Sequence, residues 1–248
     1  MCGRYTLRRP AEAVAAALQG MLPDGLADLP PRYNAAPTQP LPVVVAAGGR
    51  KRRCTMMRWG LVPQWMKPRP HADPARQVPG GFFNARSETA ASKPAFRGAF
   101  RHRRCLVPAD GFYEWANENG RKTPFLFSRH DETPFAFAGL HETWCPPDGS
   151  ELGTFTVLTC RPNALLAAVH DRMPVTIDEE DHDRWLHGDR RSVADLLAPS
   201  PSERWTCRAV DPRVGNVRLD GPSLVEPPGP EQPPRSKDRP VTGQHELF

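Results

Sequence analysis

The sequence predicts an α+β protein built as a single domain, with a curved, barrel-like, mainly antiparallel sheet and peripheral helices. Segments of strand length, apolar or alternating, recur from residue 104 onward and outnumber the helical segments. Strands and helices do not alternate regularly, which disfavours a parallel sheet made of strand-helix-strand units. The chain has no internal repeat, and its 248 residues suffice for one large domain with a full core. We assign this domain to residues 2–226.

The N-terminal part is predicted to contain a short helix and then an irregular stretch. The helix covers residues 10–19, because Pro10 stands in its first turn and Gly20 follows its end. Residues 25–42 are rich in proline, and we expect them to be irregular.

Two strands and a long loop are predicted next. Residues 43–47 and 52–59 have the composition of strands and are joined by a turn at residues 48–49, which are both glycine. Residues 67–81 hold four prolines and little apolar content, so we expect a surface loop.

The remaining elements are short. Ser87 is expected to cap a helix at residues 88–92, with Pro94 interrupting it. Further strands are predicted at residues 105–108, 112–115, 124–128, 134–141, 154–159 and 204–210. Further helices are predicted at residues 162–169, 179–186 (capped by Asp178) and 192–197.

The net charge of +5 comes almost entirely from arginine, since only five of the 33 basic residues are lysine. Arginine binds phosphates through a planar fork and stacks on bases, so this bias suits a nucleic-acid partner. A general bias of composition explains it equally well. Basic runs at residues 50–53 and 97–104 are therefore either a path for a DNA backbone or solvated surface.

Six cysteines are scattered without the short spacings of a zinc site, so no metal or other cofactor is expected. The five internal ones are expected to be small buried side chains. The first twenty residues do not resemble a signal peptide, and no stretch approaches the ~18 apolar residues of a membrane span. We therefore expect a cytoplasmic monomer, associated with the nucleoid when it is bound to DNA.

Cys2 directly follows Met1, and the small residues after Met1 permit removal of the methionine. The mature chain then carries an α-amine and a thiol on adjacent carbons. Their ordinary pKa values are near ~8 and ~8.5, so both are partly available as nucleophiles at neutral pH. With an aldehyde, the amine forms a Schiff base and the thiol closes it to a thiazolidine.

Polar residues beside glycine, proline or aromatic residues mark further candidate sites. Asn84, Glu114 and His170 stand in such segments. Each also has an ordinary structural explanation: Asn84 as a cap, Glu114 as the outward residue of a strand, and His170 at a helix end. It is their combination with Cys2 that points to chemistry.

Seven segments resemble, in identity and order, those of the SOS-response-associated peptidase family of abasic-site processing proteins. They are CGRY (2–5), RYNAAP (32–37), WGLVPQW (59–65), NARSE (84–88), DGFYEW (110–115), HDRMP (170–174) and VGNV (214–217). The 67–81 loop looks long for the family. The resemblance implies a protein that recognises abasic sites in single-stranded DNA and crosslinks to them through Cys2.

The resemblance also implies roles for the other candidates. Asn84 would hold the reacting amine or the deoxyribose, Glu114 would move protons during Schiff-base formation, and His170 would help to open the sugar ring. The flanking aromatics agree with this role of Glu114, since an apolar site raises a carboxyl pKa into the range useful for acid catalysis.

DNA-binding residues follow from the same resemblance. Arg4 and Arg86 would hold phosphates near the lesion, and Trp59 and Trp65 would wall the groove. The family name also implies a peptidase activity, whose physical core would be self-removal of the segment before Cys2.

Two other function classes remain open. Glutamine amidotransferases also begin with Met-Cys-Gly and use the free amine as the base for their own thiol, but their glutamine-binding motifs are not evident here. A non-catalytic single-strand-binding module would explain the arginines but not the combination of Cys2, Asn84, Glu114 and His170.

Residues 227–248 are predicted to be a disordered, proline-rich tail. The tail ends in QHELF, and Gln244, Leu247 and Phe248 resemble the short peptides by which bacterial replication proteins bind the sliding clamp. A chance pentapeptide is the alternative.

Overall fold

The computed structural model describes residues 2–10, 12–14, 18, 29–49, 51–70, 77–118, 120–146 and 148–229. Within these ranges it has no helix long and apolar enough to cross a membrane. The predicted C-terminal tail lies outside them from residue 230 on.

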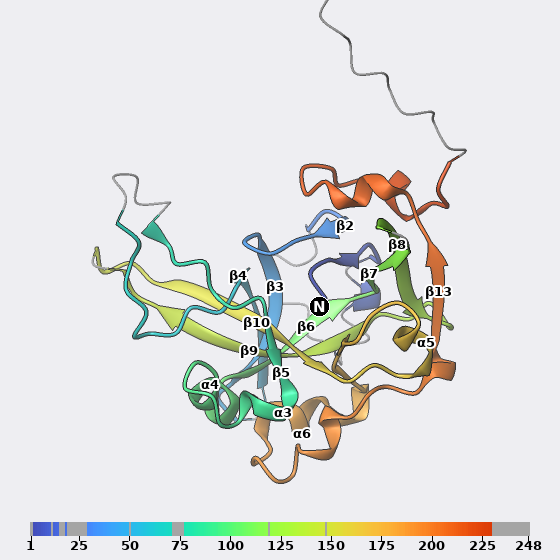
Figure 1. The fold of residues 1–248 in the computed structure, drawn as a ribbon. Helices are drawn as coiled ribbons and strands as arrows, with labels where there is room; N and C mark the ends of the chain where they lie inside the picture. The colour runs from blue at the N-terminus through green and yellow to red at the C-terminus, as the bar shows by residue number, and fades with distance from the viewer. Residues whose placement is uncertain are drawn as a thin grey trace, which may run out of the picture.

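Five strands form a closed barrel (Figure 1). They are β3 (Pro40–Ala47), β4 (Lys51–Trp59), β6 (Arg104–Ala109), β9 (Phe135–Trp144) and β10 (Leu152–Cys160). Antiparallel pairs run from β4 through β3, β6 and β9 to β10, and a parallel pairing of β10 with β4 closes the ring. The barrel is therefore mixed, with a single parallel junction.

Short strands extend the barrel. β5 (Asn84–Arg86) pairs in parallel with β10, with Asn84 opposite Val157. β11 (Met173–Pro174) continues antiparallel along β10, and β12 (Thr176–Ile177) pairs with β9. β10 thus brings β5 and the segment before β11 to the same end of the barrel.

A second, antiparallel sheet lies beside the barrel, in the order β13-β8-β7-β1-β2 (Figure 1). Its strands are β1 (Tyr5–Leu7), β2 (Arg32–Ala35), β7 (Gly111–Glu118), β8 (Arg121–Arg129) and β13 (Trp205–Ala209). The chain passes from β6 of the barrel into β7 through Asp110 alone, so the two sheets are joined at the site of the DGFYEW segment.

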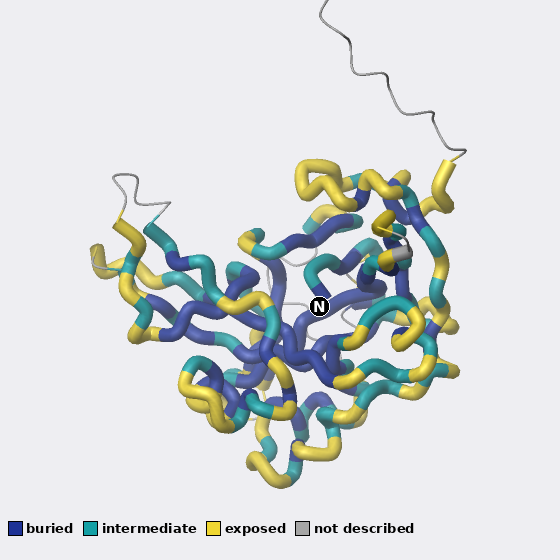
Figure 2. The backbone as a smooth tube through the Cα atoms, in the orientation of Figure 1, coloured by how far each residue is buried: buried dark blue, intermediate teal, exposed yellow. Residues whose placement is uncertain are grey.

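One apolar core connects the two sheets, as the continuous buried backbone in Figure 2 shows. Tyr5 of β1 packs against Trp59 of β4 and Phe137 of β9, with ring centroids 5.3 Å and 5.7 Å away. Phe112 of β7 reaches Phe137 as well, at 6.1 Å. Such aromatic contacts stabilise the fold beyond the burial of their area.

Helices are short and peripheral. They are α3 (Ser87–Ala90), α4 (Arg97–His102), α5 (Ala164–Ala167) and α6 (His182–His187). 3-10 turns make up the rest: η1 (Glu179–Asp181), η2 (Asp195–Leu197), η3 (Ser202–Arg204), η4 (Pro212–Gly215) and η5 (Pro222–Val225). The predicted α+β fold with a barrel-like sheet is confirmed.

Several predicted element boundaries were wrong. Within residues 25–42, β2 forms and β3 begins, because β2 finds a partner in β1. β1, β5 and α4 were not predicted. Of the helix predicted at residues 10–19, residues 12–14 are helical, and most of the others lie outside the described ranges.

One predicted cap was wrong and one was right in position only. Ser87 is the first residue of α3 rather than its cap, and that helix has no side-chain cap. Asp178 is the N-cap residue of η1, but its side chain makes no capping bond, because its carboxylate is paired with Arg129 and Arg204. In the 192–197 segment only η2 is helical.

Candidate active site

Cys2 is completely buried and lies just before β1, which is an inner strand of the second sheet, between β7 and β2. The strand is held by β7, where Tyr5 lies opposite Phe112, and by the Tyr113 N–H, which donates to the Arg4 carbonyl at 3.0 Å. The N-terminal segment is therefore a fixed part of the sheet.

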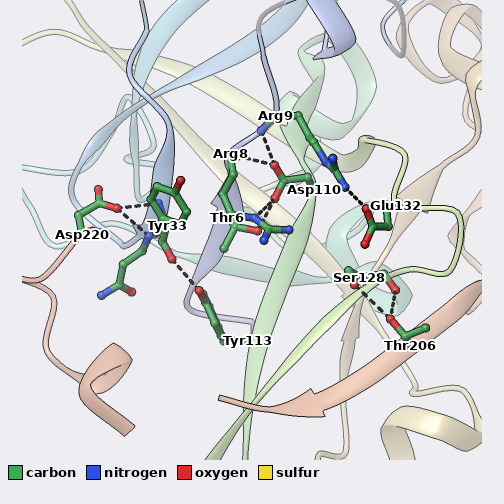
Figure 3. Close-up of polar contacts among 11 residues, drawn as sticks. Thr6, Arg8, Arg9, Tyr33, Asp110, Tyr113, Ser128, Glu132, Thr206 and Asp220 are labelled. Atoms are coloured by element: carbon green, nitrogen blue, oxygen red, sulfur yellow. Dashed lines mark hydrogen bonds and ion pairs between the residues drawn. The ribbon is translucent and has the colours of Figure 1, made fainter. Parts of the chain in front are cut away.

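Asp110 anchors the other end of β1 (Figure 3). Its buried carboxylate accepts hydrogen bonds from the Thr6 hydroxyl at 2.5 Å, from the backbone N–H groups of Arg8 and Arg9, and from the Arg8 guanidinium. Charge-assisted bonds of this kind are about twice as strong as neutral ones. The position of Cys2 is thereby fixed from both ends of the strand.

Asn84 contacts Cys2 from the barrel side. β5 carries it along β10, and its side-chain N–H donates to the carbonyl oxygen of Cys2 at 2.8 Å. The other atom of the amide, Oδ1, is buried and has no hydrogen-bond partner among the described residues. This oxygen is an acceptor close to Cys2.

Glu114 lies on β7 and is 2 % exposed. Burial raises the pKa of its carboxyl group to about 7. Burial, and then the charge of Glu114, also raise the pKa of the Cys2 thiol well above its ordinary value. The site thus holds a carboxyl group that exchanges protons near neutral pH beside a thiol that stays protonated.

His170 faces Glu114, with Nε2 lying 3.9 Å from Oε2. The Arg172 backbone N–H donates to Nδ1 at 2.9 Å, which places the proton of a neutral imidazole on Nε2, toward Glu114. Asp171 Oδ1 is 3.0 Å from Nδ1 and would accept a hydrogen bond from it if the ring were charged. Burial lowers the pKa of His170. The neutral imidazole is therefore the favoured form of His170 in this structure.

Arg172 ties the His170 segment to the NARSE segment. Its guanidinium makes two bonds to the Glu88 carboxylate, at 2.7 Å and 2.8 Å, and one to the Thr159 carbonyl at 2.6 Å. This bidentate pair links α3, which follows Asn84 and Arg86, to the loop that carries His170.

Two of the four predicted DNA-binding residues lie where DNA can reach them. Arg86 is exposed and stands two residues after Asn84 on β5, so both lie on one face of the strand. Trp65 is 64 % exposed, more than any other large apolar side chain in the described ranges.

The other two are engaged within the protein. Trp59 is completely buried and donates its indole N–H to the Phe83 carbonyl, so it supports the wall from inside the core and does not line a groove. Arg4 donates to Asn34 Oδ1 at 2.9 Å and to the carbonyls of Val214 and Gly215 at 2.6 Å and 3.0 Å. In this structure its guanidinium holds the VGNV segment.

Asn34 is a site-supporting residue that chemical reasoning from the sequence missed. Its buried amide donates to the carbonyls of Val214, Asn216 and Leu219. No pattern of side chains in the sequence predicts this contact, because the acceptors are backbone atoms about 180 residues away. The presence of Asn34 in the RYNAAP segment was the only signal.

A family model described as "SOS response associated peptidase (SRAP)" matches residues 1–217. Abasic site processing protein YoqW of Bacillus subtilis (strain 168) is 34 % identical over 232 residues, covering 91 % of this chain and 99 % of that protein. Abasic site processing protein HMCES of Rattus norvegicus is 29 % identical over 272 residues, covering 92 % of this chain and 76 % of that protein.

Solved structures have the same fold. A protein from Bacteroides thetaiotaomicron aligns with a TM-score of 0.77 at 24 % identity, over 91 % of this chain and 99 % of that one. A protein from Bordetella bronchiseptica aligns with a TM-score of 0.73 at 26 % identity, over 85 % of this chain and 100 % of that one.

Proposed function

The chain belongs to the SOS response associated peptidase (SRAP) family, and from this premise we propose that it processes abasic sites in DNA by crosslinking to them through Cys2. The names of its relatives support the lesion as the target. The crosslink, once formed, shields the lesion and suppresses strand breakage.

The convergence of Cys2, Asn84, Glu114 and His170 carries this proposal. These residues come from four separate segments, and the fold brings them together around the N-terminal residue. An ordinary structural role for each alone would not require Asn84 to bond the backbone of Cys2 or Glu114 to be buried beside its thiol.

The proposed chemistry begins after loss of Met1. The Cys2 α-amine adds to the aldehyde carbon of the opened deoxyribose, and the carbinolamine loses water to give a Schiff base. Cys2 Sγ then adds to the same carbon while the thiol proton passes to the nitrogen. One aldehyde, one amine and one thiol give a thiazolidine and one water.

Glu114 and His170 suit the proton transfers. A carboxyl group with a pKa of about 7 can donate a proton to the departing hydroxyl at neutral pH and can take it back. His170 faces Glu114 with its Nε2 and is the candidate for opening the closed sugar. The unsatisfied Oδ1 of Asn84 can accept a hydrogen bond from the amine or from a sugar hydroxyl.

Single-stranded DNA is the proposed substrate form. Arg86 offers an exposed cation beside Asn84, and Trp65 offers a surface for base stacking, which is tolerant of sequence. Arg4 would contribute indirectly, by holding the VGNV segment at the site.

Burial and Glu114 raise the pKa of the Cys2 thiol, so the thiol reacts together with a base that takes its proton. In the proposed crosslink this base is the nitrogen of the Schiff base, and in an amidotransferase it would be the free α-amine. Glutaminase and peptidase assays with the purified protein test the rivals.

The decisive experiment mixes protein with an oligonucleotide carrying one abasic site and separates the products on a denaturing gel. A heat-stable shifted band is expected for wild type and not for Cys2→Ala, with mass spectrometry confirming the loss of Met1. Cys145→Ala is the matched control, since Cys145 is an exposed free cysteine outside the site. No band from protein that begins with Cys2 would overturn the proposal.

We also propose that the C-terminal QHELF peptide, which lies outside the described residues, binds the replication sliding clamp. Gln244, Leu247 and Phe248 supply the polar and apolar contacts, and the proline-rich tail supplies reach. Deleting residues 244–248 should abolish clamp binding. Unchanged binding, or none by the full-length protein, would refute it.

A further inference from the structure

A cavity of about 890 Å³ lies at the end of the molecule formed by α4 and the segment after α6. Its walls carry Arg97 and Arg101 on one side and Arg190 and Arg191 on the other. All four side chains are exposed, and none forms an ion pair with a described residue. Four unpaired arginines around one hollow create a strongly positive potential.

The single acidic residue on the cavity wall does not neutralise them. Asp189 Oδ1 accepts hydrogen bonds from the backbone N–H groups of Arg191 and Ser192, both at 2.8 Å. These bonds, with a smaller effect of the Arg191 charge, lower the pKa of Asp189, and one carboxylate cannot offset four guanidinium groups. The arginine side chains remain available to an external anion.

Arg104 holds the two walls together. Its buried guanidinium donates to the carbonyls of Phe100 on α4 and of Trp185 and Gly188 at the end of α6. Its side chain also lies over the Trp185 ring at 5.4 Å. The cavity is therefore a built feature of the fold rather than a gap between mobile loops.

Chain connectivity places the cavity near the candidate active site. Asn84 and Arg86 are the first and last residues of β5, which runs directly into α3 beside α4 (Figure 1). Ala91, the C-cap of α3, lines the cavity. At 1.5 Å per helical residue, Ala91 is only about 7 Å along the chain axis from Arg86. A DNA strand held at Arg86 can reach the cavity within a few nucleotides.

We propose that this cavity, the α4 cavity, binds the phosphate backbone of the DNA strand that flanks the lesion. A chain of phosphates binds through many screened contacts, whereas a single small anion needs an enclosed site. Exposed arginines around an open hollow therefore suit the chain of phosphates better. The proposal rests on the proposed DNA function but concerns binding, so it can be tested without crosslinking.

The test measures the equilibrium binding of an undamaged single-stranded oligonucleotide as a function of salt. Arg97→Ala/Arg101→Ala should weaken binding and reduce the log–log salt slope by about 1.4, since each phosphate contact to a single strand contributes about 0.7. Arg190→Ala/Arg191→Ala should act alike. With an oligonucleotide too short to extend beyond the site around Arg86, the variants and wild type should bind with equal affinity.

Lys122→Ala/Arg208→Ala is the charge-matched control, because both residues are exposed on the second sheet. An unchanged slope in both arginine pairs, or an equal change in the control, would overturn the α4 cavity as a DNA site. Competition by inorganic phosphate, with no effect of the variants on DNA, would identify a small-anion site instead and also overturn it. If wild type fails to crosslink abasic DNA while the salt slopes of the variants change as expected, the proposed crosslinking function is refuted. The α4 cavity would then still stand as a site that binds single-stranded DNA.

Discussion

The side-chain amide of Asn84 donates a 2.8 Å hydrogen bond to the carbonyl oxygen of Cys2. The bond joins β5 of the barrel to the segment before β1 of the second sheet, so it fixes Cys2 relative to both sheets. In the proposed crosslinking reaction the attacking amine belongs to Cys2, so its reach would depend on this contact.

Asn84→Ala should lower the crosslinking rate at least about tenfold, because a misplaced nucleophile loses much of the benefit of its orientation. Single-turnover gels at saturating DNA measure this rate. Asn117→Ala, an exposed asparagine on β7, is the control. Equal rates for Asn84→Ala and wild type would show that the contact is only structural.

Cys2→Ser separates the two nucleophiles of the N-terminus. The variant keeps the α-amine, so it should form a Schiff base that borohydride traps, yet it should give no heat-stable product without reduction. Reductive and non-reductive gels run in parallel make the comparison. A heat-stable product from Cys2→Ser without reduction would show that the thiol does not close the adduct.

Glu114 should impose a falling limb on the pH profile of crosslinking. Its acid form is lost as the pH rises through about 7, while a higher pH frees the amine for attack. A bell-shaped profile for wild type is therefore expected, and Glu114→Gln should lose the limb near pH 7 together with most of the rate. Initial rates over a pH series test this, and a limb that persists in Glu114→Gln would point to another acid.

The same carboxyl group links stability to pH. Its folded pKa is about 7 and lies above its unfolded value, so its contribution is complete below the unfolded pKa and is lost as the pH rises through about 7. The loss should be roughly 3 kcal/mol between about pH 4 and 7 in wild type relative to Glu114→Gln. Urea unfolding of both proteins across this range measures it, and parallel curves would contradict the raised pKa.

Some elements of the fold could be predicted from the sequence, and others could not. The strands at residues 43–47 and 52–59 could be predicted because segments of strand composition flank a two-glycine turn. The structure has β3 and β4 at these positions, paired with each other. β1 and β5 have three residues each and form only because β7 and β10 offer partners. Such short strands depend on tertiary context, which outweighs local propensity.

The candidate site divides in the same way. Cys2, Asn84, Glu114 and His170 could be named because their chemistry and their segments mark them. The burial of Trp59 could not be predicted, since an aromatic residue in a motif suits a core and a groove equally well. The engagement of Arg4 with backbone carbonyls likewise leaves no trace in residue types.

Asn34→Ala tests that hidden support. The buried amide bonds three carbonyls of the 214–219 segment and accepts from Arg4, so its loss leaves several polar groups unpaired. The two N–H groups are shared among the three carbonyls, so the amide makes about three full hydrogen bonds, and at about 1 kcal/mol for each the free energy of unfolding should fall by about 3 kcal/mol. Hydrogen exchange of residues 214–219 should rise far more than that of the barrel strands. The crosslinking rate should fall as well, because Arg4 is adjacent to β1 and would lose a partner that orders it. Unchanged exchange in this segment would mean that η4 and Arg4 hold it without Asn34, and that the RYNAAP segment serves the site in another way.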